Sequence, residues 1–234
     1  MLDYMQLSSE GMNARILRQQ VIANNLANVN TTGFKKDRAF HQVLNIANVQ
    51  KGIEYEEITV FEQGALRETQ NPFNFAIKGN GFFVIETENG NRYTRNGNFD
   101  IDEQGQLILP GAGAVLGEGG PIIVGNQEFD VNLNGEIVMQ DMPVAKLKIV
   151  TFEDLSQLKK EGNNLMALKD EEESLEMKSD SSTVHQGFVE ESNVNALEEM
   201  INMLTLYREF EADQKSLQAF DKVMDDTANR IGKI

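Results

Sequence analysis

Residues 194–231 read VNALEEMINMLTLYREFEADQKSLQAFDKVMDDTANRI, and this stretch decides the fold. It contains neither Gly nor Pro, and its apolar residues recur three and four positions apart, which predicts one uninterrupted helix with a heptad seam. The seam consists of Ala196, Met200, Met203, Tyr207, Phe210, Gln214, Leu217, Asp221, Met224, Ala228 and Ile231. It is widened by Leu197, Ile201, Leu204, Phe220 and Val223. Such a helix would be roughly 55 Å long at 1.5 Å per residue, so we expect it to need a partner helix and to face more than one neighbour.

A partner helix is predicted at the other end of the chain. Residues 3–28 carry a second helical pattern, in which Gly11 is the weak position because glycine costs about 1 kcal/mol relative to alanine. The apolar seam of this pattern consists of Met5, Met12, Ile16, Ala23 and Leu26. Because the two helices lie at opposite termini, their pairing would make the middle of the chain an insertion on a coiled-coil-like helical stalk.

Short strand patterns fill the middle of the chain. Turn signals that tolerate positive φ recur at residues 89–90, 96–97, 104–105 and 134–135. Segments rich in β-branched and aromatic residues lie at 57–62, 73–78, 82–87, 122–124, 129–132, 136–139 and 145–152. These patterns predict an antiparallel all-β domain and, with the two helices, an α+β fold. We expect a helical assembly domain at 1–34 and 193–234, a connector at 35–56 and the β domain at 57–192, with Ser192 or Asn193 as the N-cap of the last helix.

Composition excludes several functional classes. The 234 residues carry a formal net charge of −16 and no Lys/Arg run longer than a pair, so we expect no nucleic-acid partner. No apolar run approaches about 18 residues, and the N-terminus has no basic segment followed by an apolar core. We therefore expect neither a membrane span nor a cleaved secretory signal. The absence of Cys removes disulfides, thiolate metal sites and Cys nucleophiles.

No constellation of residues predicts catalysis, a metal or a cofactor. The two histidines, His41 and His185, fall near the predicted boundaries of the β domain, and no nucleophile motif accompanies either. Asp100 and Asp102 imitate the start of a calcium loop, but the twelfth position is Gly111, where a bidentate Glu is needed. We therefore expect a protein that is not an enzyme.

The most specific motif follows the first helix. It consists of Asn25, Leu26, Ala27, Asn28, Thr31, Gly33 and Phe34. On physical grounds alone, Asn, Thr and Gly at this density predict a helix end with Gly33 in the left-handed conformation. The motif also resembles the N-terminal signature shared by rod, hook and hook-associated proteins of the bacterial flagellum, and it matches at every signature position.

The resemblance extends along nearly the whole chain. Residues 186–195 resemble the segment before the C-terminal helix of flagellar rod and hook proteins, and residues 77–83 and 93–99 resemble the family's β-domain motifs. Residues 116–121 and the short connector are most similar to the proximal rod protein, with the distal rod protein second. Besides the N-terminal motif, the implied motif and assembly residues are Gly187, Ser192, Asn193, Val194, Asn195, Met203, Tyr207, Phe210, Leu217 and Met224.

The resemblance implies a structural subunit of the flagellar basal-body rod. Its terminal helices would pack beside those of neighbours in an axial tube, so the expected partners are copies of itself, other rod subunits and hook-side axial proteins. It also implies passage of the unfolded chain through the flagellar type III export apparatus, from the cytoplasm to the basal body, without a cleavable signal.

Two alternatives remain open at this point. One is a distal rod or hook-type axial subunit, and the other is a hydrolase or binding module on a helical stalk. A subunit needs apolar surface left over after its own helices have paired, whereas an enzyme needs a pocket with convergent polar groups. The surface of the terminal helices is therefore the feature that distinguishes a structural subunit from an enzyme.

Overall fold

The computed structural model describes residues 2–44, 52–125, 127–169, 176–179 and 182–231. A helix lies at each end of the described chain and many short antiparallel strands lie between them, which confirms the α+β class. The chain divides into two compact units. Unit 1 comprises Met1–Ala27, Asp37–Ile58 and Asn195–Ile234, and unit 2 comprises Asn28–Lys36 and Thr59–Val194.

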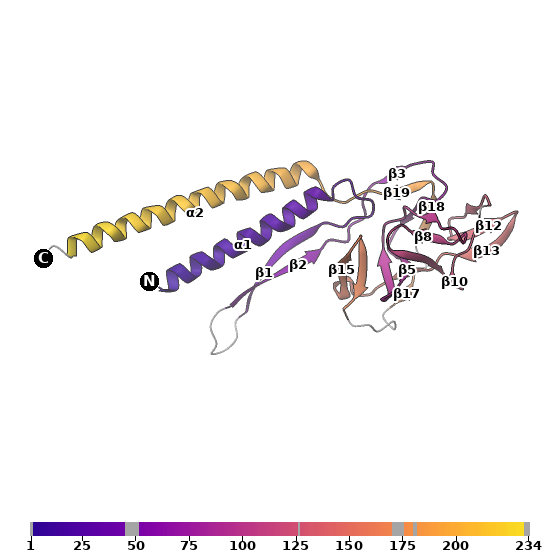
Figure 1. Ribbon diagram of the computed structural model, residues 1–234, viewed down its shortest axis with the longest axis horizontal. Coiled ribbons are helices and arrows are strands. Elements are labelled where there is room, and N and C mark those ends of the chain that lie inside the picture. Colours follow the sequence, from indigo (N-terminus) through magenta and orange to yellow (C-terminus); the bar gives the residue numbers. More distant parts are fainter. Residues whose placement is uncertain (1, 45–51, 126, 170–175, 180–181, 232–234) are drawn as a thin grey trace. The chain divides into compact units, whose positions relative to one another are not determined.

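Unit 1 contains the two helices, which lie side by side in Figure 1 with the chain termini at the same end. α1 (Leu2–Ala27) has 26 residues and α2 (Ala196–Ile231) has 36, so the uninterrupted C-terminal helix is confirmed. The N-cap of α2 is Asn195 rather than Ser192 or Asn193. The Oδ1 atom of Asn195 accepts the main-chain N–H of Leu197 at 3.1 Å and the next N–H at 3.3 Å, which satisfies donors that have no partner inside the helix.

Unit 1 also contains a two-stranded sheet of β1 (Asp37–Leu44) and β2 (Gly52–Thr59). These strands occupy much of the segment 35–56 that was expected to be a connector, and the strand expected at 57–62 overlaps only the end of β2. β1 packs against α1. Asn25 of α1 donates a side-chain hydrogen bond to the carbonyl of Asp37 at 2.8 Å and accepts the Asp37 N–H at 2.9 Å. The Asn25 amide thus pairs with the first residue of β1 as a neighbouring strand would.

Unit 2 is built, in its described residues, from four antiparallel sheets. The largest has the order β15-β16-β6-β5-β9-β8-β7, with β10 beside β9 and with β14 paired to both β5 and β17. A second sheet has the order β11-β12-β13, while β4 pairs with β18 and β3 pairs with β19. Strands near the start of unit 2 (β3 and β4) therefore pair with strands near its end (β19 and β18).

The elements of unit 2 have the following bounds. They are β3 (Leu66–Glu68), β4 (Phe75–Lys78), β5 (Phe82–Thr87), β6 (Gly90–Thr94), β7 (Asp100–Ile101), β8 (Leu107–Leu109), β9 (Gly113–Gly117), β10 (Gly120–Pro121), β11 (Asp130–Val131), β12 (Glu136–Met139), β13 (Met142–Lys146), β14 (Ile149–Thr151), a 3₁₀ turn (Leu155–Gln157), β15 (Leu158–Gly162), β16 (Leu165–Leu168), β17 (Met177–Lys178), β18 (Thr183–Gln186) and β19 (Phe188–Glu190).

The predicted turns and strands are recovered in part. Residues 89–90, 104–105 and 134–135 lie at turns between strands that pair with one another, whereas 96–97 joins two strands that are not neighbours. The strands expected at 82–87 and 136–139 match β5 and β12, but 145–152 is divided between β13 and β14. Asp102 of the calcium-like sequence caps the turn before β8, because its Oδ1 accepts the N–H of Gln104 at 2.9 Å and of Gln106 at 2.8 Å.

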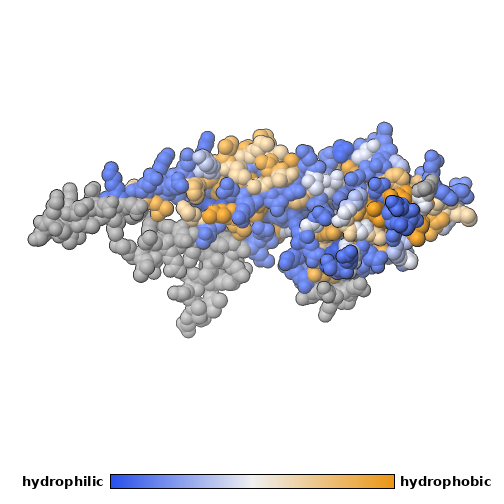
Figure 2. Space-filling model, viewed as in Figure 1, coloured by the Kyte–Doolittle hydropathy of each residue, from blue (hydrophilic) through white to orange (hydrophobic). Residues whose placement is uncertain are grey.

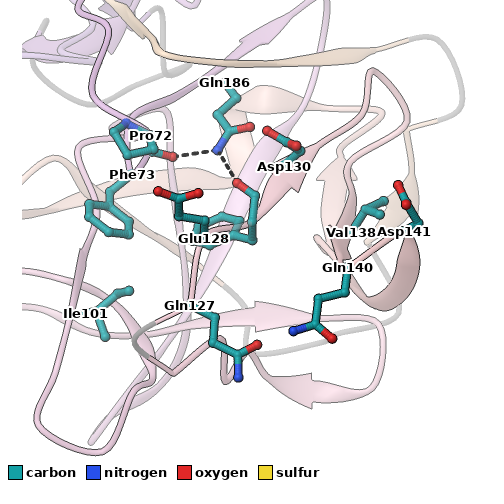
Figure 3. A pocket seen from close by; sticks show the side chains of 11 residues that line it. Pro72, Phe73, Ile101, Gln127, Glu128, Asp130, Val138, Gln140, Asp141 and Gln186 are labelled. Carbon is teal, nitrogen blue, oxygen red and sulfur yellow. Dashed lines mark hydrogen bonds between the residues drawn. The ribbon is translucent and has the colours of Figure 1, made fainter.

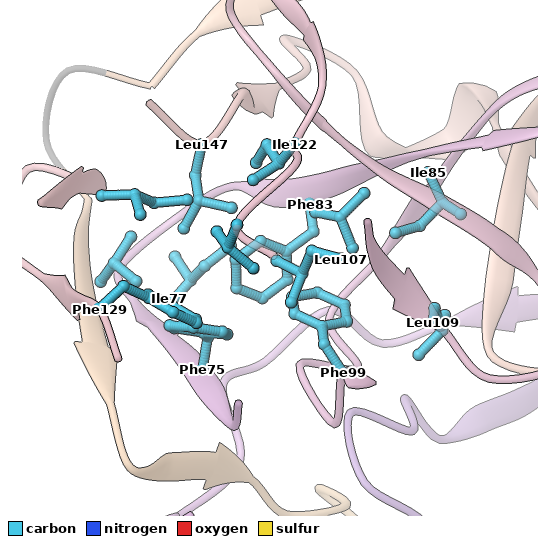
Figure 4. Close-up of a cluster of buried hydrophobic side chains, with 14 of the residues drawn as sticks. Phe75, Ile77, Phe83, Ile85, Phe99, Leu107, Leu109, Ile122, Phe129 and Leu147 are labelled. Atoms are coloured by element: carbon cyan, nitrogen blue, oxygen red, sulfur yellow. The ribbon is translucent and has the colours of Figure 1, made fainter. Parts of the chain in front are cut away.

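The core of unit 2 consists of aromatic and branched side chains from several strands (Figure 4). The residues labelled there are Phe75, Ile77, Phe83, Ile85, Phe99, Leu107, Leu109, Ile122, Phe129 and Leu147. Phe83 and Phe99 meet edge to face with ring centroids 5.1 Å apart, a geometry that the ring quadrupoles favour. Burial of each such side chain stabilises the folded state by about 1.5–3 kcal/mol. This core therefore stabilises unit 2, from which two chain segments continue into the helices.

Candidate functional site

One face of α2 is shielded from solvent. Ala196, Met203 and Phe210 are half-buried, Glu199 is buried, and Leu206 is only 4% exposed. We call these five residues the inner face. Their spacing is itself a heptad series, so a sequence signal existed for Leu206, which was not assigned to the seam. Glu199 is the polar member of this series.

α1 meets α2 through two arginines and an apolar groove. Arg15 Nη1 lies 2.6 Å from Asp213 Oδ2 and Arg15 Nε lies 3.8 Å from Glu209 Oε2, while Arg18 Nη1 lies 3.9 Å from the same Glu209 oxygen. These groups are partly exposed, so each pair contributes on the order of 0.2–1 kcal/mol. Beside them is a groove of about 390 Å³ that is lined by Ile16 of α1 and by Met203, Leu204, Leu206, Tyr207 and Phe210 of α2. The helix pair of unit 1 therefore leaves apolar space unfilled.

α2 carries a second apolar face. Positions 197 and 206 are about two and a half turns apart at 3.6 residues per turn, so Leu197 lies opposite Leu206. The exposed apolar residues on that side, which we call the outer stripe, are Leu197 (68% exposed), Met200 (49%), Ile201 (55%), Leu204 (61%) and Tyr207 (62%). Figure 2 shows hydrophobic surface gathered over this part of α2. Contiguous exposed apolar side chains of this kind mark interaction surfaces.

The predicted seam is split between these two faces. Met203 and Phe210 belong to the inner face, whereas Tyr207 belongs to the outer stripe. Leu217 is 36% exposed, and the side chain of Met224 lies outside the described residues. A broad seam that can face two neighbours was expected, and the burial of individual side chains shows which residues lie on each face.

The N-terminal motif leads from α1 into unit 2. Leu26 is half-buried and Ala27, the last residue of α1, is exposed. Thr31 closes a turn on Asn28, because its N–H donates to the Asn28 carbonyl at 3.1 Å and its hydroxyl donates to Asn28 Oδ1 at 3.2 Å. Together with the Asn25 bonds to β1, these contacts give every asparagine of the motif a structural role.

Gly33 and Phe34 lie against the β strands of unit 2. Gly33 has φ +70°, the left-handed conformation that its position predicted, and its N–H donates to the Glu190 carbonyl at 2.7 Å. A Cβ at this position would collide with the backbone of Asn96, so the site requires glycine. Phe34 is buried, and the Lys160 ammonium lies 4.3 Å from its ring centroid in a cation–π contact.

The C-terminal motif binds the same segment through Asn193. Asn193 Oδ1 accepts the Lys36 N–H at 2.7 Å, and its Nδ2 donates to the carbonyls of Val60 at 2.8 Å and Glu62 at 3.1 Å. The Asn193 amide therefore binds Lys36 and the segment 60–62, both of which are distant from it in sequence. This role replaces the helix-capping role expected for Asn193.

The other residues of the C-terminal motif shape the path towards α2. Gly187 has φ +78°, donates its N–H to the Asn74 carbonyl at 2.8 Å and accepts the Thr69 N–H at 2.7 Å. The Ser192 hydroxyl accepts the N–H of Val194 at 3.3 Å, and the Val194 side chain is buried. With Asn195 as the helix cap, each of these motif residues has a structural role along the chain that leads to α2.

A buried ionic cluster joins these two segments, and we call Lys35, Arg95 and Glu190 the buried triad. Glu190 is fully buried and Lys35 is 1% exposed. The Lys35 ammonium donates to Glu190 Oε1 and, at 2.7 Å, to the Glu62 carbonyl, while Arg95 Nη1 donates to Glu190 Oε2 at 3.2 Å. Burial lowers the pKa of the Lys35 ammonium and of the Arg95 guanidinium, because desolvation outweighs the attraction of the carboxylate. Sequence reasoning missed this cluster, since its members are far apart along the chain.

A groove of about 1060 Å³ lies on unit 2 (Figure 3). Gln186 holds one of its walls, since the Nε2 atom donates to the carbonyls of Pro72 at 2.9 Å and Phe129 at 3.1 Å. The described lining residues carry carboxylates, amides and apolar groups, and none of them has a hydroxyl, thiol, imidazole or amine. A hydrolase that used this groove would have to work with carboxylates such as Glu128 and Asp130 alone.

The two histidines do not form a common site in the described structure. His185 lies on β18, with its Nε2 atom 3.2 Å from the hydroxyl of Thr183, and the side chain of His41 lies outside the described residues. Neither helix of the described chain combines the length and the apolar character that crossing a membrane requires.

Three family models match successive parts of the chain. Residues 5–35 match a flagella basal body rod protein model, 76–149 match the D1 domain of the flagellar hook protein FlgE/F/G, and 185–231 match the C-terminal part of the flagellar basal body rod protein FlgEFG. The flagellar hook-basal body complex protein FlhO of Bacillus subtilis is 30% identical over the full length of both chains. The chain belongs to the flagellar basal-body rod protein family.

Other relatives carry the same family name. The rod protein FlgF of Rhizobium meliloti is 34% identical over 89% of this chain and 88% of its own. The rod protein FlgG of Buchnera aphidicola subsp. Baizongia pistaciae is 30% identical over 96% of this chain and 98% of its own. Membership of the rod family makes this chain a structural protein of the flagellar basal body, and the hydrolase reading is not favoured.

The buried triad of this rod protein draws on all three matched regions. Lys35 is the last residue of the first region, Arg95 lies within the second, and Glu190 lies within the third. The parts of the chain that the family models recognise separately are therefore joined in unit 2 by one set of charges.

Proposed function

We propose that this rod protein polymerises through its terminal helices, with the outer stripe of α2 packing on a helix of a neighbouring subunit. The observation that carries the proposal is the exposure of five apolar side chains of α2, while Leu206, opposite Leu197 on the helix, is only 4% exposed. Full burial of a large apolar side chain contributes about 1.5–3 kcal/mol. A stripe of this length can therefore supply several kcal/mol at each subunit contact.

The geometry of such a contact favours an open assembly. The outer stripe would pack on a different surface of the next subunit, and a head-to-tail contact repeated by a rotation and a rise builds a helical tube rather than a closed ring. In this proposal, residues 1–34 and 193–234 form the assembly domain as a coiled-coil-like stalk, the segment 35–56 accompanies it through β1, which packs on α1, and 57–192 form an outer β domain. The partners are copies of the same chain, other rod subunits and hook-side axial proteins, and the subunit has no enzymatic activity.

Two further features of the proposal concern delivery and position. The subunit reaches the basal body unfolded through the flagellar export apparatus. It occupies the proximal part of the rod, which is supported by the short segment between Phe40 and Glu57. Labelling of this chain in isolated basal bodies tests the position, and density that continues up to the hook junction would assign it to the distal rod instead.

The assembly surface is tested by adding a charge to the outer stripe. Leu204→Glu places a carboxylate on a side chain that is 61% exposed in the subunit, so the isolated protein should keep its helix content and its resistance to urea. Polymerisation of the purified protein, followed by sedimentation, and its incorporation into basal bodies should both fall sharply, because burial of an unpaired charge costs several kcal/mol.

The matched control is Asn202→Glu, which adds the same charge at an exposed position of α2 outside the outer stripe. It should assemble like the unmodified chain. Normal assembly of Leu204→Glu, or equal loss in both variants, would contradict the proposal. Leu206→Ala separates the two faces, because removing this inner-face side chain should lower the free energy of unfolding by about 2–5 kcal/mol.

A further inference from the structure

Glu190 is hydrogen-bonded to two buried cations. Its carboxylate accepts hydrogen bonds from the Lys35 ammonium, from Arg95 Nη1 at 3.2 Å and from the Gly64 N–H at 3.0 Å. The carboxylate therefore serves two buried cations, and the triad carries one excess positive charge. Buried charges are tolerated when they are paired and hydrogen-bonded, so both cations depend on this one anion.

The two cations are not held equally. Arg95 also donates to the Gly79 carbonyl at 2.7 Å, and its guanidinium lies 5.2 Å from the centroid of the Phe82 ring, so it is anchored within the β core. Lys35 belongs to the segment 28–36, which enters unit 2 from the end of α1. Its ammonium has one further hydrogen bond, to the Glu62 carbonyl. Glu190 and Arg95 thus form a neutral ion pair, which we call the seat, and the Lys35 ammonium binds to it.

Glu190 is also attached to the same segment through its main chain. Its carbonyl accepts the Gly33 N–H at 2.7 Å, while β19, which ends at Glu190, pairs with β3. Five residues beyond Glu190 the chain reaches Asn195, the cap of α2. The residue therefore lies where the segment that follows α1 meets the segment that precedes α2.

We propose that Glu190 is the positioning residue for assembly: its carboxylate seats the segment 28–36 on unit 2 and thereby sets the points from which both terminal helices leave that unit. This inference rests on the proposed assembly through the helices. Lys35 and Glu190 are 155 residues apart, so the segment can be seated only after the last strands of unit 2 have formed. A chain whose C-terminal part is not yet folded holds its N-terminal segment unseated.

Charge balance predicts opposite behaviour for two substitutions of similar size. Glu190→Gln keeps the shape of the side chain but leaves two buried cations without an anion. Lys35→Met keeps an unbranched side chain that is one atom shorter and leaves the neutral pair of Glu190 and Arg95. We expect Glu190→Gln to release the segment and Lys35→Met to leave it seated.

The experiment is hydrogen exchange on the full-length chain, followed by mass spectrometry of peptides covering residues 28–36, with peptides from β5 and β6 as the internal reference. Glu190→Gln should accelerate exchange in the segment by at least about tenfold, since breaking a buried pair from one side is strongly destabilising. Lys35→Met should change it less than about threefold. Polymerisation should be lost in the first variant and kept in the second.

A double variant keeps the test decisive if Glu190→Gln unfolds the whole chain. Adding Lys35→Met to Glu190→Gln removes one of the two unpaired cations, so exchange in 28–36 and in the β5–β6 reference should move back towards the unmodified values. Packing alone predicts the reverse, because two substitutions disturb the site more than one. Equal exchange in the two single variants, or no rescue in the double variant, would overturn the role of Glu190.

The outcome is distinguishable from failure of the proposed function. The exchange measurement reports on the seat in the isolated subunit and needs no polymer. If Leu204→Glu assembles normally while Glu190→Gln releases the segment, the outer stripe is not the assembly surface but the seat stands. If Glu190→Gln releases the segment and still assembles like the unmodified chain, Glu190 does not position the helices.

Discussion

Asn193 accepts the main-chain N–H of Lys36 at 2.7 Å, across 157 residues of sequence. The same side chain donates to two carbonyls of the segment that follows β2, so its amide holds three points of backbone at once. Gly33 and Glu190 are joined by a further main-chain bond at 2.7 Å. The flagellar motifs near the two ends of the chain therefore act in this fold as two halves of one backbone junction.

The first prediction concerns this amide. Asn193→Ala removes three hydrogen bonds and leaves a main-chain donor and carbonyls without their partner, so we expect the free energy of unfolding to fall by about 2 kcal/mol or more. Asn195→Ala is the matched control, because it removes only a helix cap and should cost about 1 kcal/mol. Urea unfolding followed by circular dichroism measures both. A smaller loss for Asn193 than for Asn195 would show that water replaces the junction bonds.

The second prediction compares two glycines with the same backbone conformation. Gly33 has φ +70° and Gly111 has φ +74°, but a Cβ at Gly33 would meet the backbone of Asn96, whereas nothing lies within 4 Å of a Cβ at Gly111. Gly111→Ala should cost about 1–2 kcal/mol, the penalty of the left-handed conformation alone. Gly33→Ala should cost clearly more, because the backbone must also move. Thermal unfolding of the two variants checks this, and equal losses would argue against a close approach at Gly33.

The third prediction concerns the far part of α2. Side chains from Gln214 to Ala219 are exposed, whereas Leu206 is 4% exposed, so support from the rest of unit 1 decreases along the helix. Helices without tertiary packing are marginal in water. In dilute subunit, amide exchange should therefore be slow around Leu206 and fast beyond Asp213, and assembly should slow it along the whole helix. Uniform protection in the dilute subunit would mean that α2 does not need a neighbour.

The fourth prediction follows from the lowered pKa of Lys35. Burial holds the pKa of Lys35 in the folded protein below its ordinary value of 10.5. Between the folded pKa and 10.5 the unfolded chain binds more protons at this site than the folded chain, so the contribution of Lys35 to stability rises with pH in that window. Below the folded pKa both states are protonated, and the cost of burying the charge is constant.

The measurement is the difference in unfolding free energy between the unmodified chain and Lys35→Met at pH values from neutral to about 10, because the other titrating groups cancel in this comparison. The difference should shift in favour of the unmodified chain with a slope of up to about 1.4 kcal/mol per pH unit. A shift in the opposite direction would show that pairing with Glu190 outweighs desolvation and raises the pKa.

Much of the fold could be predicted because its causes are local. The helix period of residues 196–231, the turn at 89–90 and the left-handed Gly33 each follow from residues within a few positions of one another. Residues 35–56 were expected as a connector, but they contain most of β1 and β2, which pair with each other, and the Asn25 amide bonds to the first residue of β1. Local propensity does not reveal such a partner.

The candidate site divides in the same way. Sequence determined that α2 has a broad apolar seam and that two flagellar motifs flank the β strands, since both are patterns of neighbouring residues. Only the tertiary structure decided that Leu206 faces inward while Leu204 faces solvent, and that Lys35, Arg95 and Glu190 share one buried site. The physical reason is that burial and charge pairing depend on which segments, distant in sequence, come together in space. The order of residues along the chain does not give the distances between such segments, which are set when the strands pair.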